Sequence, residues 1–263
     1  SYFHFSYSEV EWDPRFANHV YVGKDQSLFK SIDGGATFDT LYTFPGDVRR
    51  FEISRDDPDY IYIIVYHSYW DWRIHRSTDG GISFSEINTP PYSGGSWRNI
   101  SFALNPFDKN EIWTASNSSS DGNKVFSSTD GGTNWTNRYT STIAGEGIKD
   151  LIFQSGVESD KIYAMTNDNF YYYDKSESNW FEYSNGLPVS HSGFMMLPFY
   201  RDEKIRMASA KGIWEIPFLG ASNVQAQPMV ARDSVFCSRD TISLDSYSIV
   251  DSTGASFNWT ITP

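Results

Sequence analysis

One octapeptide occurs three times in the chain, and it limits the possible folds more than any other feature. The copies are Ser31–Phe38, Ser77–Phe84 and Ser128–Trp135, and all read Ser-x-Asp-Gly-Gly-x-x followed by Phe or Trp. Equivalent aspartates lie 46 and 51 residues apart, a period typical of one four-stranded blade of a β-propeller. A degenerate fourth copy, Tyr173–Trp180, has one extra residue and lacks the glycines. The repeat therefore predicts a chain built from successive blades.

The octapeptide suits a tight hairpin between two strands. Glycine reaches backbone conformations with positive φ that other residues rarely adopt, so a Gly-Gly pair lets the chain reverse sharply. The aspartate side chain can accept backbone N–H groups of the same turn. We therefore predict a structural role for the Asp-Gly-Gly triplets, which are Asp33, Gly34, Gly35, Asp79, Gly80, Gly81, Asp130, Gly131 and Gly132.

Short β-strands surround each octapeptide. A first strand such as Phe51–Ser54 leads into a turn that contains Pro58, a second strand such as Tyr60–Val65 follows, and a third runs into the octapeptide. Alternating apolar and polar residues with regular turn signals indicate strands. Aromatic residues, 17% of the chain, pack well on pleated surfaces. The sequence thus predicts an all-β propeller of about five four-stranded blades, at about 6–43, 47–88, 97–140, 147–184 and 193–218.

The octapeptide resembles the Asp-box, also called the BNR repeat, and the resemblance covers roughly residues 6–218. Asp-boxes occur in sialidases, in propeller hydrolases that cleave xyloglucan, in sortilin-type receptors and in a photosystem assembly factor family. The resemblance implies a propeller in which each box joins the third and fourth strands of a blade, away from the ligand face. It also implies that the boxes are structural rather than catalytic.

The closure of the ring has two alternatives. The fifth blade, 193–218, lacks an evident box and an evident fourth strand. A larger closed ring needs blades before Ser1, whereas a five-bladed ring closes if Ser1–Ser6 supply the missing outer strand.

The composition changes at residue 219. Residues 219–229 form a polar, turn-prone linker. Residues 230–263, with Trp259 in the family's central strand, are similar to the opening of a PKD-type immunoglobulin-like β-sandwich, which needs about 100 residues in full. A propeller followed by a PKD-type domain resembles large secreted and surface proteins of the Bacteroidetes, many of which are exported by the type IX route. Cys237, the one cysteine, is either a buried free thiol or half of a disulfide whose partner lies beyond Pro263.

Charge and hydropathy exclude several classes of protein. A formal net charge of −12 and a pI of about 4.8 argue against nucleic acid as a partner, because phosphate binding needs a basic surface. No apolar run reaches the length of about 18 residues that a membrane span requires. A hydrophobic fraction of 39% with interspersed charges argues against disorder.

Two sets of loops form the ligand face of such propellers, those before each first strand and those between the second and third strands. The loop at 67–73 carries Tyr69, Trp70 and Trp72, whose rings suit stacking on sugars, although alternate aromatics also pack between blades. The loop therefore either packs its aromatic rings between blades or contacts a glycan or polymer.

Cations precede three of the first strands. Alignment of the following hydrophobic residues predicts that Arg50, Arg98 and Lys149 occupy matching positions. There they would either hold a carboxylate or sulfate or form a salt-bridged rim. The candidate ligand-binding residues are Arg50, Tyr69, Trp70, Trp72, Trp97, Arg98 and Lys149.

The sequence assigns no catalytic residue. Sialidases carry an Arg-Ile-Pro signature, and this chain has Arg73-Ile74-His75 instead. The xyloglucan-cleaving propellers use two aspartates as acid and base. The carboxylates Asp47, Asp71, Glu146 and Asp150 are available, but nothing in the sequence marks two of them as a pair.

No metal site or cofactor is predicted. The five histidines do not form a zinc spacing, and no phosphate-binding loop occurs. The Ser/Asn-rich loop around Asp121–Asn123 is either solvated or a set of calcium ligands.

Two classes of function remain. The first is a secreted or cell-surface propeller that binds a polysaccharide or protein partner in adhesion or assembly. The second is a polysaccharide-active enzyme, a glycoside hydrolase or lyase, with its site on the loop face. We favour the first because the sequence contains no sialidase or hydrolase signature.

Overall fold

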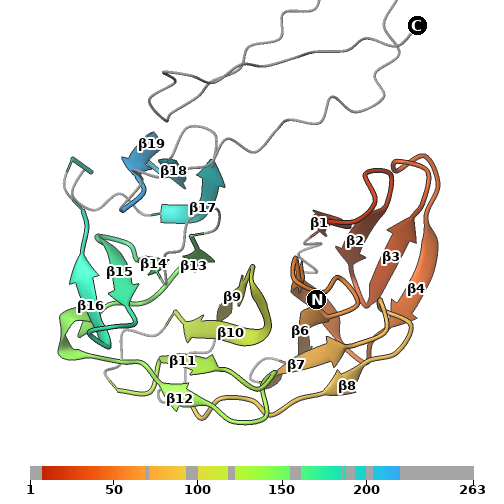
Figure 1. Ribbon diagram of the computed structural model, residues 1–263, viewed down its shortest axis with the longest axis horizontal. Coiled ribbons are helices and arrows are strands. Elements are labelled where there is room, and N and C mark those ends of the chain that lie inside the picture. The colour runs from red at the N-terminus through yellow and green to blue at the C-terminus, as the bar shows by residue number, and fades with distance from the viewer. Residues whose placement is uncertain are drawn as a thin grey trace, which may run out of the picture.

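The computed structural model describes residues 8–68, 71–92, 100–117, 122–154, 161–184, 186–187, 193–199 and 204–219. In these ranges the chain forms five antiparallel β-sheets that follow one another in an arc (Figure 1). This arrangement confirms the predicted all-β propeller. The predicted outer strand at Ser1–Ser6, the linker from Gly220 onward and the sandwich at 230–263 with Cys237 lie outside the described residues.

Each sheet is one blade, and its strands are ordered as in the chain. Blade 1 comprises β1 (Ser8–Trp12), β2 (Val20–Lys24), β3 (Ser27–Ser31) and β4 (Asp39–Thr43). Blade 2 comprises β5 (Asp47–Ile53), β6 (Ile61–Ser68), β7 (Asp71–Ser77) and β8 (Ser85–Glu86). Blade 3 comprises β9 (Ile100–Asn105), β10 (Asp108–Ser116), β11 (Val125–Ser128) and β12 (Thr136–Asn137).

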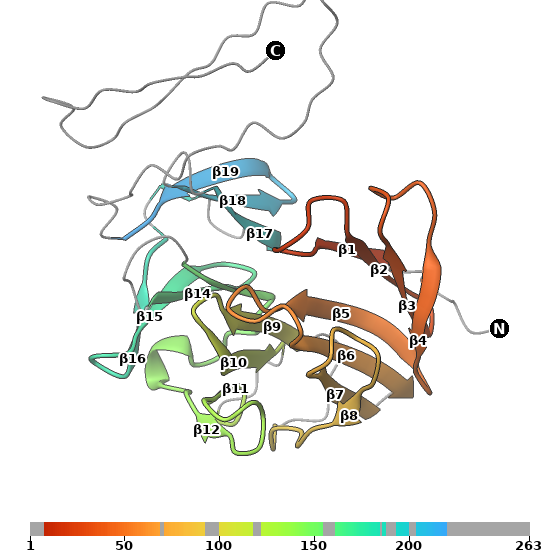
Figure 2. The same cartoon turned by 45° about the vertical axis from the view of Figure 1, so that its right-hand side comes forward.

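Blades 4 and 5 complete the arc. Blade 4 comprises β13 (Asp150–Phe153), β14 (Lys161–Met165), β15 (Phe170–Asp174) and β16 (Asn179–Glu182), and a short 3-10 helix, η1 (Ser141–Ile143), precedes it. Blade 5 has three strands among the described residues, β17 (Gly193–Phe199), β18 (Lys204–Ser209) and β19 (Gly212–Pro217). The first strands of successive blades contact one another (Figure 2), so they line the centre of the arc.

The octapeptides form the turns between the third and fourth strands of blades 1 to 3. In the first copy, Asp33 accepts the backbone N–H of Thr37 at 2.9 Å and the hydroxyl of Ser31 at 2.7 Å. The Ser31 hydroxyl in turn accepts the N–H of Gly35 at 2.8 Å. The other two copies repeat these bonds at 2.7–2.9 Å. The aspartates therefore hold their own turns, through the backbone hydrogen bonds that the sequence predicts.

An aromatic residue on the second strand packs each blade against the following one. Tyr21, Tyr62, Trp113 and Tyr163 are fully buried, and they belong to the clusters between blades 1 and 2, 2 and 3, 3 and 4, and 4 and 5 in turn. We call the surface of a blade that meets the following blade its C-side face. These four residues mark equivalent positions on four C-side faces.

The first strand of the following blade provides the other half of each contact. Its apolar residues at alternate positions point back toward the preceding blade, on what we call the N-side face. The pairs are Phe51 and Ile53 in β5, Phe102 and Leu104 in β9, and Leu151 and Phe153 in β13, all of them buried. Apolar burial between neighbouring sheets is therefore the main force that joins the blades.

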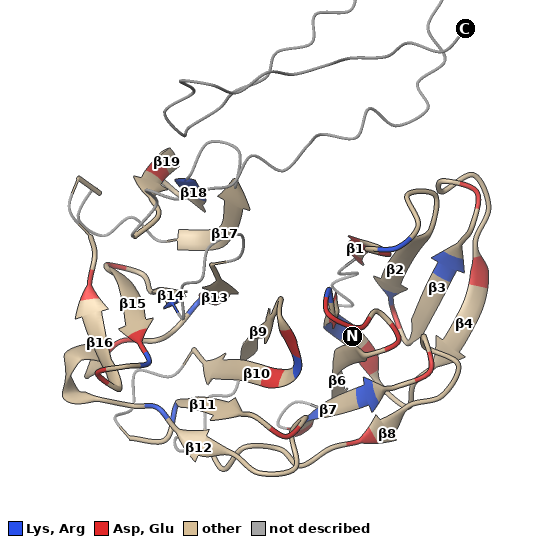
Figure 3. Cartoon of the chain, in the orientation of Figure 1, with Lys and Arg blue, Asp and Glu red and all other residues tan. Residues whose placement is uncertain are grey.

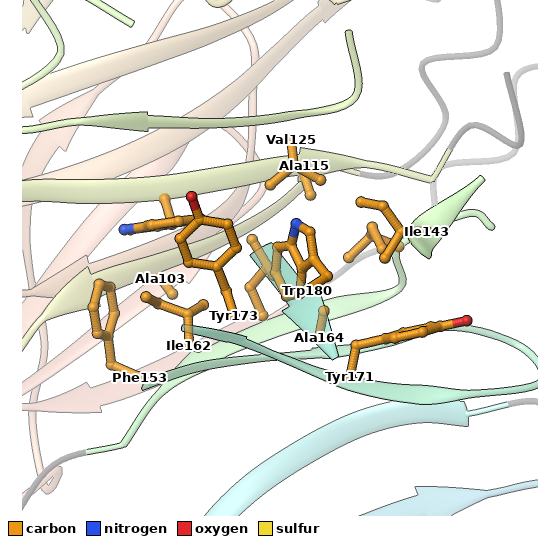
Figure 4. Packing of buried hydrophobic residues seen from close by; sticks show 13 residues of the cluster. Ala103, Ala115, Val125, Ile143, Phe153, Ile162, Ala164, Tyr171, Tyr173 and Trp180 are labelled. Atoms are coloured by element: carbon orange, nitrogen blue, oxygen red, sulfur yellow. The ribbon is translucent and has the colours of Figure 1, made fainter. Parts of the chain in front are cut away.

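The contact between blades 3 and 4 buries five aromatic side chains, which are Trp113, Phe153, Tyr171, Tyr173 and Trp180 (Figure 4). Trp180 is fully buried and packs edge-on against Tyr173, with ring centroids 5.2 Å apart, and against Trp113 at 6.3 Å. Its indole N–H donates to the carbonyl oxygen of Arg138 at 2.8 Å. The degenerate fourth octapeptide has thus kept its final aromatic, which joins blade 4 to the end of blade 3.

Candidate functional site

Charged side chains meet at the centre of the arc, where the first strands face one another. The guanidinium of Arg50 on β5 donates to Asp150 on β13 at 2.8 Å and to Glu52 at 3.4 Å. Its Nε atom lies 3.9 Å from a carboxylate oxygen of Glu9 on β1. Arg50 therefore connects blades 1, 2 and 4, and we call these four residues the central cluster.

The three carboxylates of the central cluster also hold the next blade. A carboxylate oxygen of Glu9 accepts the backbone N–H of Phe51 in β5. Glu52 accepts the N–H of Leu104 in β9 at 2.9 Å, and Asp150 accepts that of Met196 in β17 at 2.8 Å. Each of these carboxylate–amide contacts crosses from a C-side face to the following first strand, so the cluster joins blades as well as concentrating charge.

Burial changes the acidity of two of these carboxyl groups. It raises the pKa of Glu9 to about 7, although Arg50 and the Phe51 N–H act in the opposite direction. It raises the pKa of Glu52 to about 8, again against the effect of Arg50. Burial alone would lower the pKa of Arg50, but the carboxylates of Asp150, Glu52 and Glu9 raise it. Near neutral pH the cluster therefore contains a permanent cation beside carboxyl groups that can exchange protons.

The strand register corrects the predicted match between Arg50 and Lys149. Arg50 pairs with Ile64, which lies two residues after the buried aromatic Tyr62 of β6. Asp150 pairs with Met165, which lies two residues after Tyr163, the equivalent aromatic of β14. The residue that matches Arg50 is therefore Asp150. Phe51, which follows Arg50, corresponds to Leu151, and the residue before Leu151 is Asp150 rather than Lys149.

Lys149 lies in the turn directly before β13. Its side chain is half-buried, and its backbone N–H donates to the Met165 carbonyl at 2.7 Å. Arg98 and Trp97 lie outside the described residues, as do Tyr69 and Trp70. Of the predicted ligand-binding residues, the structure thus describes Arg50, Lys149 and Trp72.

A second group of candidate residues lies where β5 begins, β6 ends and β7 begins. Trp72 stacks obliquely on Tyr66, with ring centroids 4.8 Å apart, and the guanidinium of Arg49 lies 5.0 Å from the centre of the Tyr66 ring. Asp47 stands opposite Tyr66 in the strand register and lies 3.5 Å from Arg49. These half-buried residues, Asp47, Arg49, Tyr66 and Trp72, form what we call the blade-2 patch.

An ion pair flanks Trp72 in the sequence but projects from the opposite face of blade 2. Arg73 donates to Asp71 at 3.0 Å and to Glu86 at 2.9 Å, and the hydrogen bonds from Arg73 lower the pKa of Asp71. Asp71 is therefore an ionised, paired carboxylate. Glu146, which precedes β13 in blade 4, accepts a hydrogen bond from the side-chain amide of Asn169 at 2.6 Å.

Sequence reasoning missed Glu9, Glu52 and Tyr66. The alternation of charged and apolar residues in Glu9-Val-Glu and in Arg50-Phe-Glu52 is the signal that could have found the first two. Charged residues that alternate with apolar ones on a first strand must face the opposite surface of the blade. The pairing of Tyr66 with Trp72 depends on the strand register, which the sequence does not specify.

Metal ligands and membrane spans were also considered. Within the described ranges, no group of three or more His, Cys, Asp or Glu side chains could hold a metal ion. The predicted alternative of calcium depends on Asp121, which lies outside those ranges. The described part of the chain also contains no helix long and apolar enough to cross a membrane. Acidic and basic residues are both present on each blade (Figure 3).

Known structures share this arrangement of strands. An ancestral GH74 enzyme matches 82% of this chain and 31% of its own with a TM-score of 0.63 and 18% identity. The GH74 xyloglucanase from Xanthomonas campestris matches 80% of this chain and 38% of its own, with a TM-score of 0.61 and 15% identity. This chain thus spans about a third of either enzyme.

A third similar structure comes from a different kind of protein. A chain of the nidogen/laminin complex matches 79% of this chain and 74% of its own, with a TM-score of 0.59 and 11% identity. Identities this low show a common fold only. No curated protein matches the sequence. The model of the DUF6242 beta propeller domain matches residues 76–212, slightly more than half of the chain, and the protein belongs to that family.

Proposed function

We propose that this protein is a secreted or cell-surface binding module that holds a glycan or another extracellular polymer at the blade-2 patch. The observation that carries the proposal is the Tyr66–Trp72 pair with Arg49 over the tyrosine ring. These residues lie on the end of the blade where the loops of the predicted ligand face begin.

The chemistry of the patch suits a sugar. Half-buried aromatic rings offer an apolar surface to the C–H face of a pyranose, while flanking polar groups receive its hydroxyl groups. Arg49 and Asp47 supply a donor and an acceptor beside the rings. The site would thus combine stacking with hydrogen bonding.

A glycan and polysaccharide array that includes xyloglucan tests this proposal. We expect retained binding by the native chain, and a loss of about tenfold in affinity for Trp72→Ala, because a stacking contact contributes up to about 1.4 kcal/mol. Arg49→Gln removes the cation without a large cavity and should also weaken binding.

Phe107→Ala is the matched control, because this exposed aromatic lies in the turn after β9, outside the patch. If Phe107→Ala weakens binding as much as Trp72→Ala does, or if no glycan binds the native chain, the proposal is contradicted.

A second candidate is a polysaccharide-active enzyme that uses the central cluster. The observation that favours it is the raised pKa of Glu9 and Glu52 beside Arg50, because a carboxyl group that stays protonated near neutral pH can act as a general acid. Fragment release from the array ligands would support it. Glu52→Gln keeps an oxygen that can accept the Leu104 N–H but cannot donate a proton, so unchanged release by this variant would exclude Glu52 as the acid.

A further inference from the structure

Two histidines pack against each other on the N-side face of blade 2. His75 of β7 stands opposite Ile63 in the strand register, and Ile63 belongs to the cluster between blades 1 and 2, so both side chains point toward blade 1. The His75 ring lies nearly parallel to that of His67 at the end of β6, with ring centroids 5.9 Å apart. His75 is 8% exposed and His67 is half-buried. We call these two residues the histidine pair.

The segment that joins blade 1 to blade 2 lies against the histidine pair. It runs from Phe44 to Gly46, between β4 and β5. The buried Phe44 ring packs edge-on against His75, with ring centroids 5.5 Å apart. A Cβ atom on Gly46 would lie 2.9 Å from the Cα atom of His67, so the backbone of Gly46 passes directly over that residue. The connecting segment therefore contacts both histidines.

Each ring of the histidine pair buries a nitrogen that has no partner. The Nε2 atoms of His67 and His75 are shielded from solvent and form no hydrogen bond with the described residues. A neutral imidazole that carries its proton on Nδ1 leaves Nε2 as an acceptor only. Protonation would turn Nε2 into a buried N–H donor without an acceptor and would place a positive charge against the neighbouring ring. The packed arrangement therefore fits neutral rings and not charged ones.

Three charged side chains of blade 2 face the histidine pair. Glu86 of β8 stands opposite His75 in the strand register, and Asp71 of β7 interacts electrostatically with the other histidine. Arg73, between them, donates to Asp71 at 3.0 Å and to Glu86 at 2.9 Å. Both carboxylates are thus already paired with a cation. The connecting segment itself brings Phe44 and Gly46 to the rings, and neither carries a charge.

The pKa of His75 gives the direction in which acid acts on this contact. Burial is the largest effect and lowers the pKa of His75, Arg73 and His67 act in the same direction, and Glu86 opposes them. An arrangement that releases the ring into water takes up a proton more readily than the packed one. Packing is therefore fully favoured above the ordinary pKa of histidine, about 6.5, and is weakened as the pH falls below that value.

We propose that the histidine pair makes the contact between the connecting segment and blade 2 sensitive to acid. The neutral rings hold Phe44 against blade 2, and when they take up protons they turn toward water and the segment separates from the blade. The buried cluster between blades 1 and 2 contains no carboxyl group and no histidine. Blade 1 therefore stays attached, and the opening is confined to the connecting segment.

Hydrogen exchange of the full chain at pH 7.5 and pH 5, corrected for the intrinsic effect of pH on exchange, tests the proposal. The N–H groups of Phe44 and Val48 donate to the carbonyl oxygens of Gln26 and Asp25 at 2.7 and 2.6 Å, so a peptide that spans 41–50 reports the opening. We expect this peptide to exchange at least about threefold faster at pH 5, since linkage allows up to about tenfold per pH unit for each histidine.

The double variant His67→Phe, His75→Phe keeps an aromatic ring at both positions but cannot be protonated, so it should lose the acid response. His19→Asn is the matched control, because His19 directly precedes β2 and stacks on Phe16 instead, and it should respond like the native chain. If the double variant does not fold, NMR titration of His75 in the native chain replaces it, with a pKa below the ordinary value expected. Equal exchange at both pH values overturns the proposal, as does an acid response that the double variant keeps or a His75 pKa that is not lowered.

Discussion

Arg50 shows how far the role of a single residue depends on the fold around it. In the sequence it precedes an apolar strand and suggests an anion-binding position. In the structure its guanidinium is held by carboxylates from three blades, among them Asp150, a hundred residues away in the chain. The identity of such partners depends on which first strands meet at the centre, and local sequence contains no information on that. The expected match with Lys149 was also displaced by one residue, because Phe51 corresponds to Leu151, which follows Asp150.

The raised pKa of Glu52 predicts a specific dependence of stability on pH. A carboxyl group whose pKa is higher in the folded state, about 8 here against 4.5, contributes stability that is present below the unfolded value and lost as the pH rises through the folded value. Glu52→Gln cannot ionise, so it should resemble the native protein at pH 5 and become the more stable of the two by pH 9. The difference should grow by no more than about 1.4 kcal/mol per pH unit.

Urea denaturation of both proteins between pH 5 and pH 9 measures this difference. Comparison of the two proteins cancels the contributions of other groups, such as His75, whose pKa is lowered by burial. If the free energies of unfolding stay parallel over the whole range, the Glu52 carboxyl group does not titrate as we describe.

The octapeptide glycines allow two effects to be separated at the residue scale. Gly81 has a φ of 93°, and a Cβ atom there would lie 2.6 Å from a methyl carbon of Leu41 in blade 1. Gly34 has a φ of 77°, with nothing within 4 Å of the Cβ position. Gly34→Ala should therefore cost about 1 kcal/mol of conformational strain, and Gly81→Ala about 2–3 kcal/mol, because it adds overpacking between blades. Thermal denaturation measures both variants. If they lose the same amount of stability, the Leu41 side chain moves away from the added methyl group at no cost.

At the scale of the element, the blades were predictable because their signals are local. The Gly-Gly turns, the alternation of apolar residues and the proline turns each act within about ten residues, and they predicted successive antiparallel strands. Side-chain direction was harder to predict. Trp72 was expected in a loop at 67–73, whereas it opens strand β7 and faces Tyr66 across the sheet. Strand β6 ends at Ser68 and strand β7 begins at Asp71, so both strands extend into the loop that was expected at 67–73.

Trp180 gives a test of the element that carries the degenerate octapeptide. Trp180→Phe leaves a cavity among Tyr173, Trp113 and their neighbours and removes the donor to the Arg138 carbonyl. We expect a loss of about 2–4 kcal/mol in the free energy of unfolding. Trp12→Phe is the matched control, because Trp12 is exposed, and it should change stability by less than about 0.5 kcal/mol. Chemical denaturation measures both, and equal losses would contradict the packing role of Trp180.

At the scale of the whole molecule, the number of neighbours differs among the blades. Blades 2, 3 and 4 each pack against two others, whereas blades 1 and 5 each have one neighbour among the described residues. The repeat predicted about five blades, but not which side chains would meet at their centre, because that depends on how the blades arrange around it.

This arrangement predicts a gradient of local stability. Amides of β10 and β14 should exchange with deuterium at least tenfold more slowly than those of β1 and β19, because opening a terminal blade disrupts one interface rather than two. Hydrogen exchange followed by mass spectrometry tests this prediction. Uniform protection across the blades would show that the arc opens as one cooperative unit.

The carboxylate–amide contacts have a consequence for how such a chain can change over evolutionary time. Glu9, Glu52 and Asp150 each bind a backbone N–H of the next blade rather than a side chain. A backbone N–H is present whatever residue occupies the position, proline excepted. A blade can therefore exchange its side chains, or be replaced by a duplicate of another blade, without losing the polar contact from its predecessor. The polar contacts between these neighbouring blades therefore do not depend on which side chains the blade that donates the N–H carries.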